Sequence, residues 1–163
     1  MKRIKIQPLT PEAFAPFGTY TSVLNPEGEY LAGPHHKYYR ENSRYFAQTG
    51  LPIGLSPIVV DKQPMKIDAV EYHNYACEAI LPINDDAIVH VTPAGGAPDT
   101  AKTKAFLVPK GTMITLFPGV YHLCPLPAAA DKLNALILLP ERTHNNDFTL
   151  VELPADQQFQ ITK

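Results

Sequence analysis

Two segments decide the fold of this chain: EYHNYACE at positions 71–78 and GTMITLFPGVYH at positions 111–122. Glu71 and His73 are two residues apart, so on a β-strand both side chains point to the same face. Glu78 lies at an odd offset from His73 and reaches that face only where the chain turns or bulges, which residues 74–76 favour. The first segment thus predicts a strand, a turn and a second strand that share one face.

The second segment adds another imidazole to this face. His122 follows Pro118-Gly119, a dipeptide typical of a β-turn. Two imidazoles and two carboxylates from three extended segments would then converge inside a barrel. Such a group suits a divalent metal or acid–base chemistry. A structural role, with both histidines hydrogen-bonded inside the barrel, is the alternative.

Short extended segments fill most of the remaining sequence. Their spacing, and the turn residues that bound them, are typical of sandwiches and barrels. The expected strands cover residues 4–6, 19–23, 55–60, 64–73, 77–83, 87–91, 105–108, 113–117, 120–123, 133–139 and 148–153. Residues 35–46 favour either a strand pair or an excursion over the barrel. Because no linker or repeat divides the chain, we expect one all-β domain, a barrel or jelly roll over residues 1–163.

Two local signals add detail. Thr10-Pro11-Glu12 has the order of an N-cap, a first helical residue and a first-turn acid, and predicts a short helix ending near Gly18. Asn84-Asp85-Asp86 lies between two expected strands and predicts a β-hairpin. The 17 prolines agree with many turns and short strands, because proline interrupts helices and central strands.

Composition excludes several classes of function. The formal net charge is -2, so the chain lacks the basic surface that nucleic-acid binding requires. No apolar run approaches the roughly 20 residues of a membrane span, and no signal peptide is expected, because no apolar stretch follows the basic N-terminus. Cys77 and Cys124 are far apart and form no CxxC motif, so we expect free thiols in the cytoplasm. Neither a nucleic acid nor a membrane is therefore an expected partner.

The two opening segments have the spacing E-x-H-x4-E followed by G-x6-PG-x2-H. This spacing resembles a degenerate form of the two-part signature of the cupin superfamily. The ligands of that signature are usually His, His, Glu and a later His. Glu71 stands at the first position, and His73, Glu78 and His122 stand at the other three. The resemblance implies a cupin-type barrel and a divalent metal on His73, Glu78 and His122, with Glu71 beside them. This mixed nitrogen and oxygen set suits Zn, Mn, Fe or Ni.

A closer resemblance is to the ureidoglycolate lyase family, cupin-fold (RmlC-like) proteins of purine degradation. It is carried by LTPEAFAPFG at 9–18, EYHNYACEAILPI at 71–83, PDTAKTKAFLV at 98–108, GVYHLCPL at 119–126 and FTLVEL at 148–153. The resemblance implies a homodimeric carbon–nitrogen lyase that converts (S)-ureidoglycolate to glyoxylate and urea. The reaction needs a base for the hydroxyl proton and an acid for the departing nitrogen, with Glu71 and Glu78 as the expected catalytic residues.

Three positions depart from the family pattern. Tyr72 and Lys104 stand where the family has Arg, and Leu123-Cys124 stands where it has a second His. Lys104 and Tyr121 are the expected substrate-binding residues, with Lys104 as the holder of an anionic group. Because these changes affect residues that would hold the substrate, two alternatives stay open. They are another cupin enzyme, such as a sugar-acid isomerase or epimerase, and a non-catalytic cupin that binds a small molecule.

Overall fold

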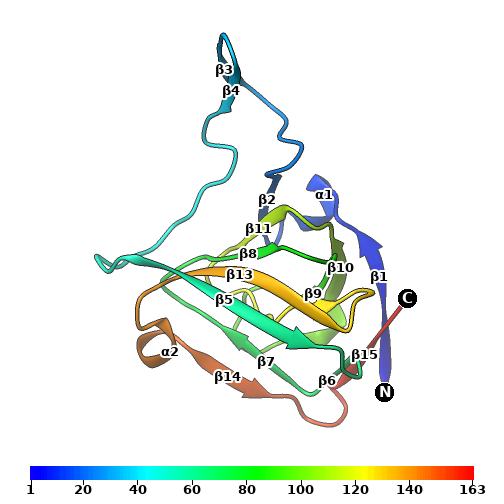
Figure 1. Cartoon of the computed structure of the whole chain (residues 1–163). Coiled ribbons are helices and arrows are strands. Elements are labelled where there is room, and N and C mark those ends of the chain that lie inside the picture. Colours follow the sequence, from blue (N-terminus) through cyan, green and yellow to red (C-terminus); the bar gives the residue numbers. More distant parts are fainter.

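The computed structural model describes residues 1–163 and folds them into two main curled sheets around one core (Figure 1). The strands are β1 (Lys2–Pro8), β2 (Gly18–Ser22), β3 (Tyr30–Gly33), β4 (His36–Tyr39), β5 (Ile53–Asp61), β6 (Lys66–Ile67), β7 (Ala69–Tyr72), β8 (Glu78–Pro82), β9 (Ala87–Val91), β10 (Lys104–Val108), β11 (Thr112–Leu116), β12 (Leu126–Pro127), β13 (Lys132–Pro140), β14 (Thr149–Glu152) and β15 (Phe159–Thr162). The helices are α1 (Pro11–Phe14), the 3-10 helix η1 (Thr100–Lys102) and α2 (Thr143–Asn146). The prediction of an all-β fold with one or two short α-helices is confirmed.

The order of the six-stranded sheet is β12-β9-β10-β1-β15-β6, and that of the five-stranded sheet is β2-β11-β8-β13-β5. Two further pairs, β7 with β14 and β3 with β4, complete the topology. Most neighbouring strands are antiparallel, but β1 runs parallel to both β10 and β15. None of the helices has the length and hydropathy that a bilayer crossing requires.

Alternate residues of the central strands fill the space between the sheets. On β13, Leu133, Ala135, Ile137 and Leu139 are buried, while the residues between them are more exposed. A fully buried Leu or Ile side chain stabilises the fold by roughly 1.5–3 kcal/mol relative to an exposed one. The expected strand at residues 133–139 is therefore present, and its buried residues alternate although most of its sequence is apolar.

The predicted N-terminal helix is present and ends one turn after it begins. Thr10 is its N-cap and accepts a hydrogen bond from the backbone N–H of Ala13, and Pro11 is the first helical residue. The helix buries Phe14 against Phe106, with ring centroids 5.2 Å apart and the rings nearly perpendicular. This packing attaches the helix to the core beside β10.

The predicted hairpin at residues 84–86 is wrong. The strands on either side, β8 and β9, exist, but they belong to different sheets. Asp85 accepts hydrogen bonds from the backbone of Ala129 and Ala130, and Asn84 bonds to the backbone of Lys132 and Asn134. The connection is therefore held against the start of β13, and it carries the chain from one sheet to the other.

Other boundaries differ from expectation in informative ways. The expected strand 64–73 is divided into β6 and β7, and residues 120–123 form only isolated bridges. Residues 35–46 contribute β4, which pairs with β3 in a hairpin that projects from the barrel on long connections (Figure 1). Tyr30 and Tyr39 pack across this hairpin with centroids 5.2 Å apart.

Candidate active site

The backbone brings Glu71 and His122 side by side. Glu71 donates its N–H to the carbonyl of His122 at 2.7 Å and accepts from the N–H of His122 at 2.9 Å. Residues that face each other in an antiparallel pair extend their side chains to the same side. This bridge explains why the end of β7 and the segment before β12 contribute to one site.

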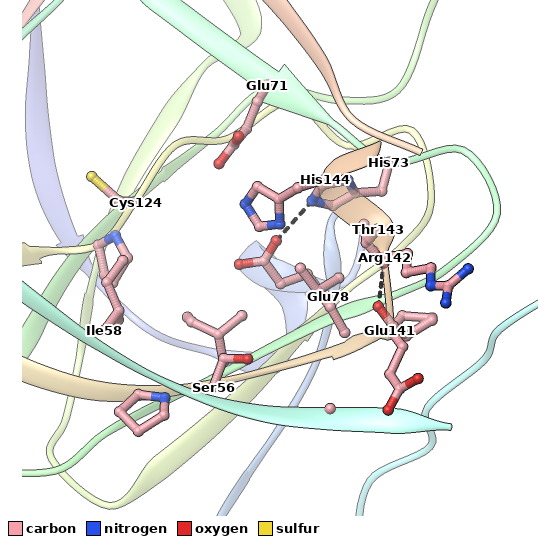
Figure 2. Close-up of a pocket in the computed structure, with 16 residues that line it drawn as sticks. Ser56, Ile58, Glu71, His73, Glu78, Cys124, Glu141, Arg142, Thr143 and His144 are labelled. Atoms are coloured by element: carbon pink, nitrogen blue, oxygen red, sulfur yellow. Dashed lines mark hydrogen bonds and ion pairs between the residues drawn. The ribbon is translucent and has the colours of Figure 1, made fainter. Parts of the chain in front are cut away.

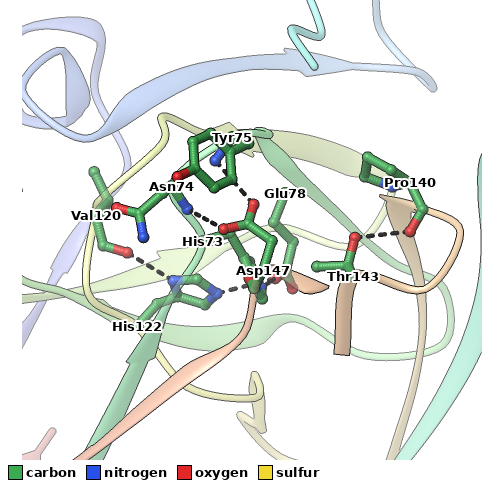
Figure 3. A network of polar contacts seen from close by, with 9 residues as sticks. All are labelled: His73, Asn74, Tyr75, Glu78, Val120, His122, Pro140, Thr143 and Asp147. Carbon is green, nitrogen blue, oxygen red and sulfur yellow. Dashed lines mark hydrogen bonds and ion pairs between the residues drawn. The ribbon is translucent and has the colours of Figure 1, made fainter. Parts of the chain in front are cut away.

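A turn places His73 and Glu78 together despite their odd spacing. Between β7 and β8 the chain bends at Asn74 and Tyr75, where the sequence predicted a turn. The carboxylate of Asp147 accepts from the N–H of Asn74 at 2.7 Å and from the N–H of Tyr75 at 2.8 Å (Figure 3). Asp147 thus organises the turn from a distant part of the chain.

The predicted turn at Pro118-Gly119 is also present and is attached to the same segment. Gly119 has a φ of 78°, a left-handed conformation that glycine adopts without strain. Its N–H donates to the carbonyl of His73 at 2.6 Å, and Val120 donates to Phe117 at 3.2 Å. The turn therefore sets the position of His122 relative to His73.

His73, Glu78 and His122 form one buried cluster. The Nε2 atoms of both histidines lie 3.0 Å from Oε2 of Glu78, and the two ring centroids are 5.5 Å apart. One potential ligand atom from each residue lies within 4.8 Å of the others. Each of the three residues is less than a tenth exposed to solvent.

The outer nitrogens of the two imidazoles fix how the rings are protonated. His73 Nδ1 lies 2.5 Å from the carbonyl oxygen of Asp147, and His122 Nδ1 lies 2.9 Å from that of Val120 (Figure 3). A carbonyl only accepts, so each Nδ1 carries the proton. Each Nε2 faces Glu78, and it carries there either a second proton or a lone pair. Two lone pairs facing a carboxylate oxygen repel it unless a cation lies between them.

Electrostatics agree with a site that favours positive charge near Glu78. Burial alone would lower the pKa of His122, but the charge of Glu78 and its hydrogen bond raise it to about 8. Burial opposes the ionisation of Glu78 as well, yet His122 and His73 outweigh it and lower the pKa of that carboxyl to about 2. The pKa of His73 is also raised, since its bonds to Glu78 and Asp147 exceed the effect of burial.

These residues fit a divalent transition metal. One ligand atom from each of the three side chains lies within 4.8 Å of the others, close enough for all three to bind one ion. Protonated Nδ1 atoms held by backbone carbonyls are the usual outer partners of metal-binding histidines. The donor set of two imidazoles and one carboxylate suits Zn, Mn, Fe or Ni.

Glu71 belongs to the same site but is outside the ligand cluster. Its side chain lines the adjoining pocket and is half-buried. Burial and the nearby charge of Glu78 raise the pKa of Glu71, although His122, His73 and His144 act in the opposite direction. A carboxyl group with a raised pKa at a pocket wall suits proton transfer near neutral pH.

The pocket beside the cluster is a cavity of about 510 Å³ (Figure 2). It opens between β5, β13, α2 and the cluster, and Figure 2 shows Glu71, Glu78 and His144 pointing into one space. The lining residues are Gly54, Ser56, Pro57, Ile58, Glu71, His73, Glu78, Cys124, Pro125, Ile137, Leu139, Pro140, Glu141, Arg142, Thr143 and His144. A volume of this size accommodates a small molecule.

The sequence did not identify the contribution of α2. His144, for which no functional role was expected, lines the pocket and stacks on Phe148 with centroids 5.3 Å apart. Arg142 also lines the pocket, with a backbone φ of 63°. No motif marks this segment. Its one signal is a group of polar residues directly after a strongly apolar strand.

The two expected substrate-binding residues do not line this pocket. Tyr121 is buried, its ring packs 4.9 Å from that of Tyr72, and its hydroxyl donates to the carbonyl of Gly95 at 3.1 Å. Lys104 begins β10, with Nζ 6.0 Å from the ring centroid of Phe17. A substrate role for either residue stays a prediction.

The two cysteines are unpaired, as the sequence predicted. Cys124 lines the pocket, where burial raises the pKa of its thiol, and the charges of Glu71 and Glu78 raise it further. A thiol held in its neutral form is a poor nucleophile. Cys77 is buried next to Glu78 in the chain and lies outside the pocket lining.

A family model and the individual relatives of this chain agree on one family. A family model described as ureidoglycolate lyase matches residues 1–162. The ureidoglycolate lyase of Rhodobacter capsulatus is 32% identical over 136 residues, which cover 78% of this chain and 82% of that protein. The ureidoglycolate lyase of Pseudomonas paraeruginosa is 31% identical over 129 residues and 75% of each chain. A structure of oxalate decarboxylase superposes with a TM-score of 0.42 at 14% identity, over 79% of this chain and 37% of that one.

Proposed function

This chain belongs to the ureidoglycolate lyase family, and from that premise we propose that it cleaves (S)-ureidoglycolate to glyoxylate and urea. The observation that supports this most is the pocket, where a carboxyl group of raised pKa adjoins a buried cluster of two histidines and a glutamate. The cleavage needs proton transfers and electrostatic stabilisation, and the pocket contains residues suited to both.

The reaction moves one proton off oxygen and one onto nitrogen. A base removes the hydroxyl proton of the substrate, the C–O bond becomes the carbonyl of glyoxylate, and the C–N bond breaks. The electron pair of that bond passes to the departing nitrogen, which an acid protonates to release urea. No water is consumed, so the pocket has to supply both a base and an acid.

Glu71 is the better candidate for the base of the two expected catalytic residues. Glu78 accepts hydrogen bonds from both histidines, and its lowered pKa makes it a weak base. Glu71 lacks these bonds, lines the pocket, and has a pKa raised by burial. We assign Glu78 to the metal cluster and Glu71 to proton abstraction.

His144 is the candidate for the acid. Its ring is oriented by stacking on Phe148 and points into the pocket from the side of α2 (Figure 2). Histidine is the side chain that most often transfers protons in catalysis. Glu71 would remove the proton from the hydroxyl oxygen, and His144 would protonate the departing nitrogen. Both atoms are bonded to the same carbon of the substrate.

His73, Glu78 and His122 are the residues that would hold a divalent metal, whose identity the donor set leaves open among Zn, Mn, Fe and Ni. When bound, such an ion would polarise the substrate oxygens and stabilise the negative charge that develops on them. The protein's own part is to present two Nε2 lone pairs by holding each Nδ1–H on a backbone carbonyl.

Urea release tests this function directly. Purified protein, assayed with ureidoglycolate for urea and glyoxylate in equal amounts, is expected to turn over above the spontaneous rate. Glu71→Gln in the same assay controls for contaminating activity. Absence of turnover with every one of the four metals would refute the lyase function and favour a binding protein or another cupin enzyme.

We also propose that the chain forms a homodimer in a reducing, cytoplasmic setting. Free cysteines support the setting. β5 is the edge strand of its sheet, and Leu55 and Val59 on it are 65% and 60% exposed. An exposed edge strand offers unpaired backbone groups to another chain, and exposed apolar side chains on it are typical of an interaction surface.

Sedimentation should give twice the 18.0 kDa of one chain. Leu55→Lys should lower that mass, and Leu150→Lys, on β14, is the matched control.

A further inference from the structure

The charge of the pocket lining is unbalanced. Three carboxyl groups line it, those of Glu71, Glu78 and Glu141, and Arg142 is the one arginine or lysine among the lining residues. A substrate that carries a carboxylate has to approach Glu71 against like charge. A cation at the wall of the pocket, in addition to the metal that His73, Glu78 and His122 would hold, would attract the carboxylate and orient it.

The backbone of Arg142 is held by hydrogen bonds, whereas its guanidinium group has no partner in the chain. Its carbonyl accepts from the N–H groups of Asn145 at 2.9 Å and Asn146 at 3.0 Å. The next residue, Thr143, is buried and donates its hydroxyl to the carbonyl of Pro140 at 2.7 Å. The guanidinium forms no ion pair with any carboxylate of the chain. A fixed base with an unpartnered charged head is suited to binding an anion that arrives from outside.

The backbone conformation at this position argues in the same direction. Arg142 has φ 63° and ψ 17°, the left-handed region that glycine occupies freely and that costs free energy in any other residue. Backbone requirements alone would favour glycine here. An arginine therefore occupies this position although the left-handed backbone disfavours it, and the residue lines the pocket.

We propose that Arg142 binds the carboxylate of the substrate by a charge-assisted, two-pronged hydrogen bond. This inference rests on the proposed function and identifies the group that recognises the anionic half of the substrate. In Figure 2 the guanidinium of Arg142 extends away from Glu71, so the side chain has to rotate toward the pocket to bind the carboxylate at the edge formed by α2. The hydroxyl-bearing carbon, one bond from the carboxylate, would then face Glu71. Arg142 then takes the part that the sequence assigned to Lys104, which lies outside the pocket.

The two products of the reaction allow a test that is independent of turnover. Glyoxylate carries the carboxylate, and urea is neutral. Calorimetric titration of metal-loaded protein with each compound compares the wild type with Arg142→Gly, Arg142→Lys and a control, Arg44→Ala. Arg44 is exposed and contacts Glu41 at 3.8 Å. Elemental analysis checks that all four proteins hold the same metal content.

Arg142→Gly should raise the dissociation constant of glyoxylate by about tenfold or more, the loss expected for one charge-assisted hydrogen bond. Urea binding should not change, Arg142→Lys should lose less, and Arg44→Ala should match the wild type. Because glycine relieves the left-handed backbone, the melting temperature of Arg142→Gly should stay equal or rise, which separates lost binding from lost folding.

Wild-type affinity of Arg142→Gly for glyoxylate would overturn the proposal, as would absence of glyoxylate binding by the wild type. The outcome is separable from that of the lyase assay. Glyoxylate binding that depends on Arg142 without urea release would leave the proposal standing and refute the lyase function. Normal turnover with an unchanged KM in Arg142→Gly would do the reverse.

Discussion

Removal of the Asp147 carboxylate should weaken the metal cluster without touching a ligand. In Asp147→Ala the N–H groups of Asn74 and Tyr75 lose the acceptors that now lie 2.7 and 2.8 Å away. A hydrogen bond to a charged group contributes about 1.5–3 kcal/mol, and these lie at a solvent-exposed turn, so the lower end applies to each. We expect a loss of about 3 kcal/mol in the free energy of unfolding, or roughly 6–12 °C in melting temperature for a chain of this size.

The same substitution should lower metal affinity through the position of His73. The backbone carbonyl of Asp147 accepts from His73 Nδ1, and the turn that Asp147 caps connects His73 to Glu78. Loss of such outer partners typically costs about 10–100-fold in metal affinity. Titration of metal-free protein with Zn²⁺ or Mn²⁺ measures this loss.

Asp99→Ala is the matched control, because Asp99 caps the backbone of Ala101 at 3.1 Å in η1 and takes no part in the metal cluster. It should cost some stability and leave metal affinity unchanged. Wild-type metal affinity in Asp147→Ala would refute the idea that this turn sets the spacing of the two ligands.

Three further outcomes follow from the assigned roles. Glu71→Gln should reduce kcat by about 10²–10⁴-fold while metal content stays unchanged, and the acid limb of the wild-type pH profile should lie above the usual range of a glutamate, since the pKa of Glu71 is raised. His144→Asn should lower kcat more than it raises KM, whereas equal kcat in both proteins would remove His144 from the proton transfer. Metal affinity should fall about tenfold for each unit of pH below 8, because His122, with its pKa of about 8, has to lose the Nε2 proton before it binds; a flat profile between pH 6 and 8 would contradict this.

Local rules predicted the parts of the fold that depend on local structure. The apolar run at residues 133–139 marked β13, and Thr10-Pro11 marked the start of α1. The hairpin at 84–86 failed because its turn residues bond to β13 and the turn before it, contacts that no local pattern records. For the same reason the parallel pairing of β1 with β10 and β15 was not predicted.

The residues of the site also fall into those that local sequence signals predicted and those that depend on distant contacts. Two turn signals, at residues 74–76 and at Pro118-Gly119, together with the resemblance to the two-part motif, predicted that His73, Glu78 and His122 face one space, and their ligand atoms do lie close together. Asp147 and Arg142 could not be found in this way. The first acts through backbone N–H groups far away in the chain, and the second depends on a left-handed backbone that no residue preference for arginine would suggest.

The metal cluster and the carboxylate-binding edge meet at α2. Asp147 ends the segment that Arg142 begins, so one short stretch holds the His73 ring through its backbone and presents the proposed anion-binding side chain. A substrate bound by Arg142 would therefore be positioned by the same element that positions a metal ligand. It follows that a substitution that shifts α2 as a whole, such as Thr143→Val, which removes the bond to Pro140, should alter metal affinity and glyoxylate affinity together. Arg142→Gly, by contrast, should alter glyoxylate affinity alone.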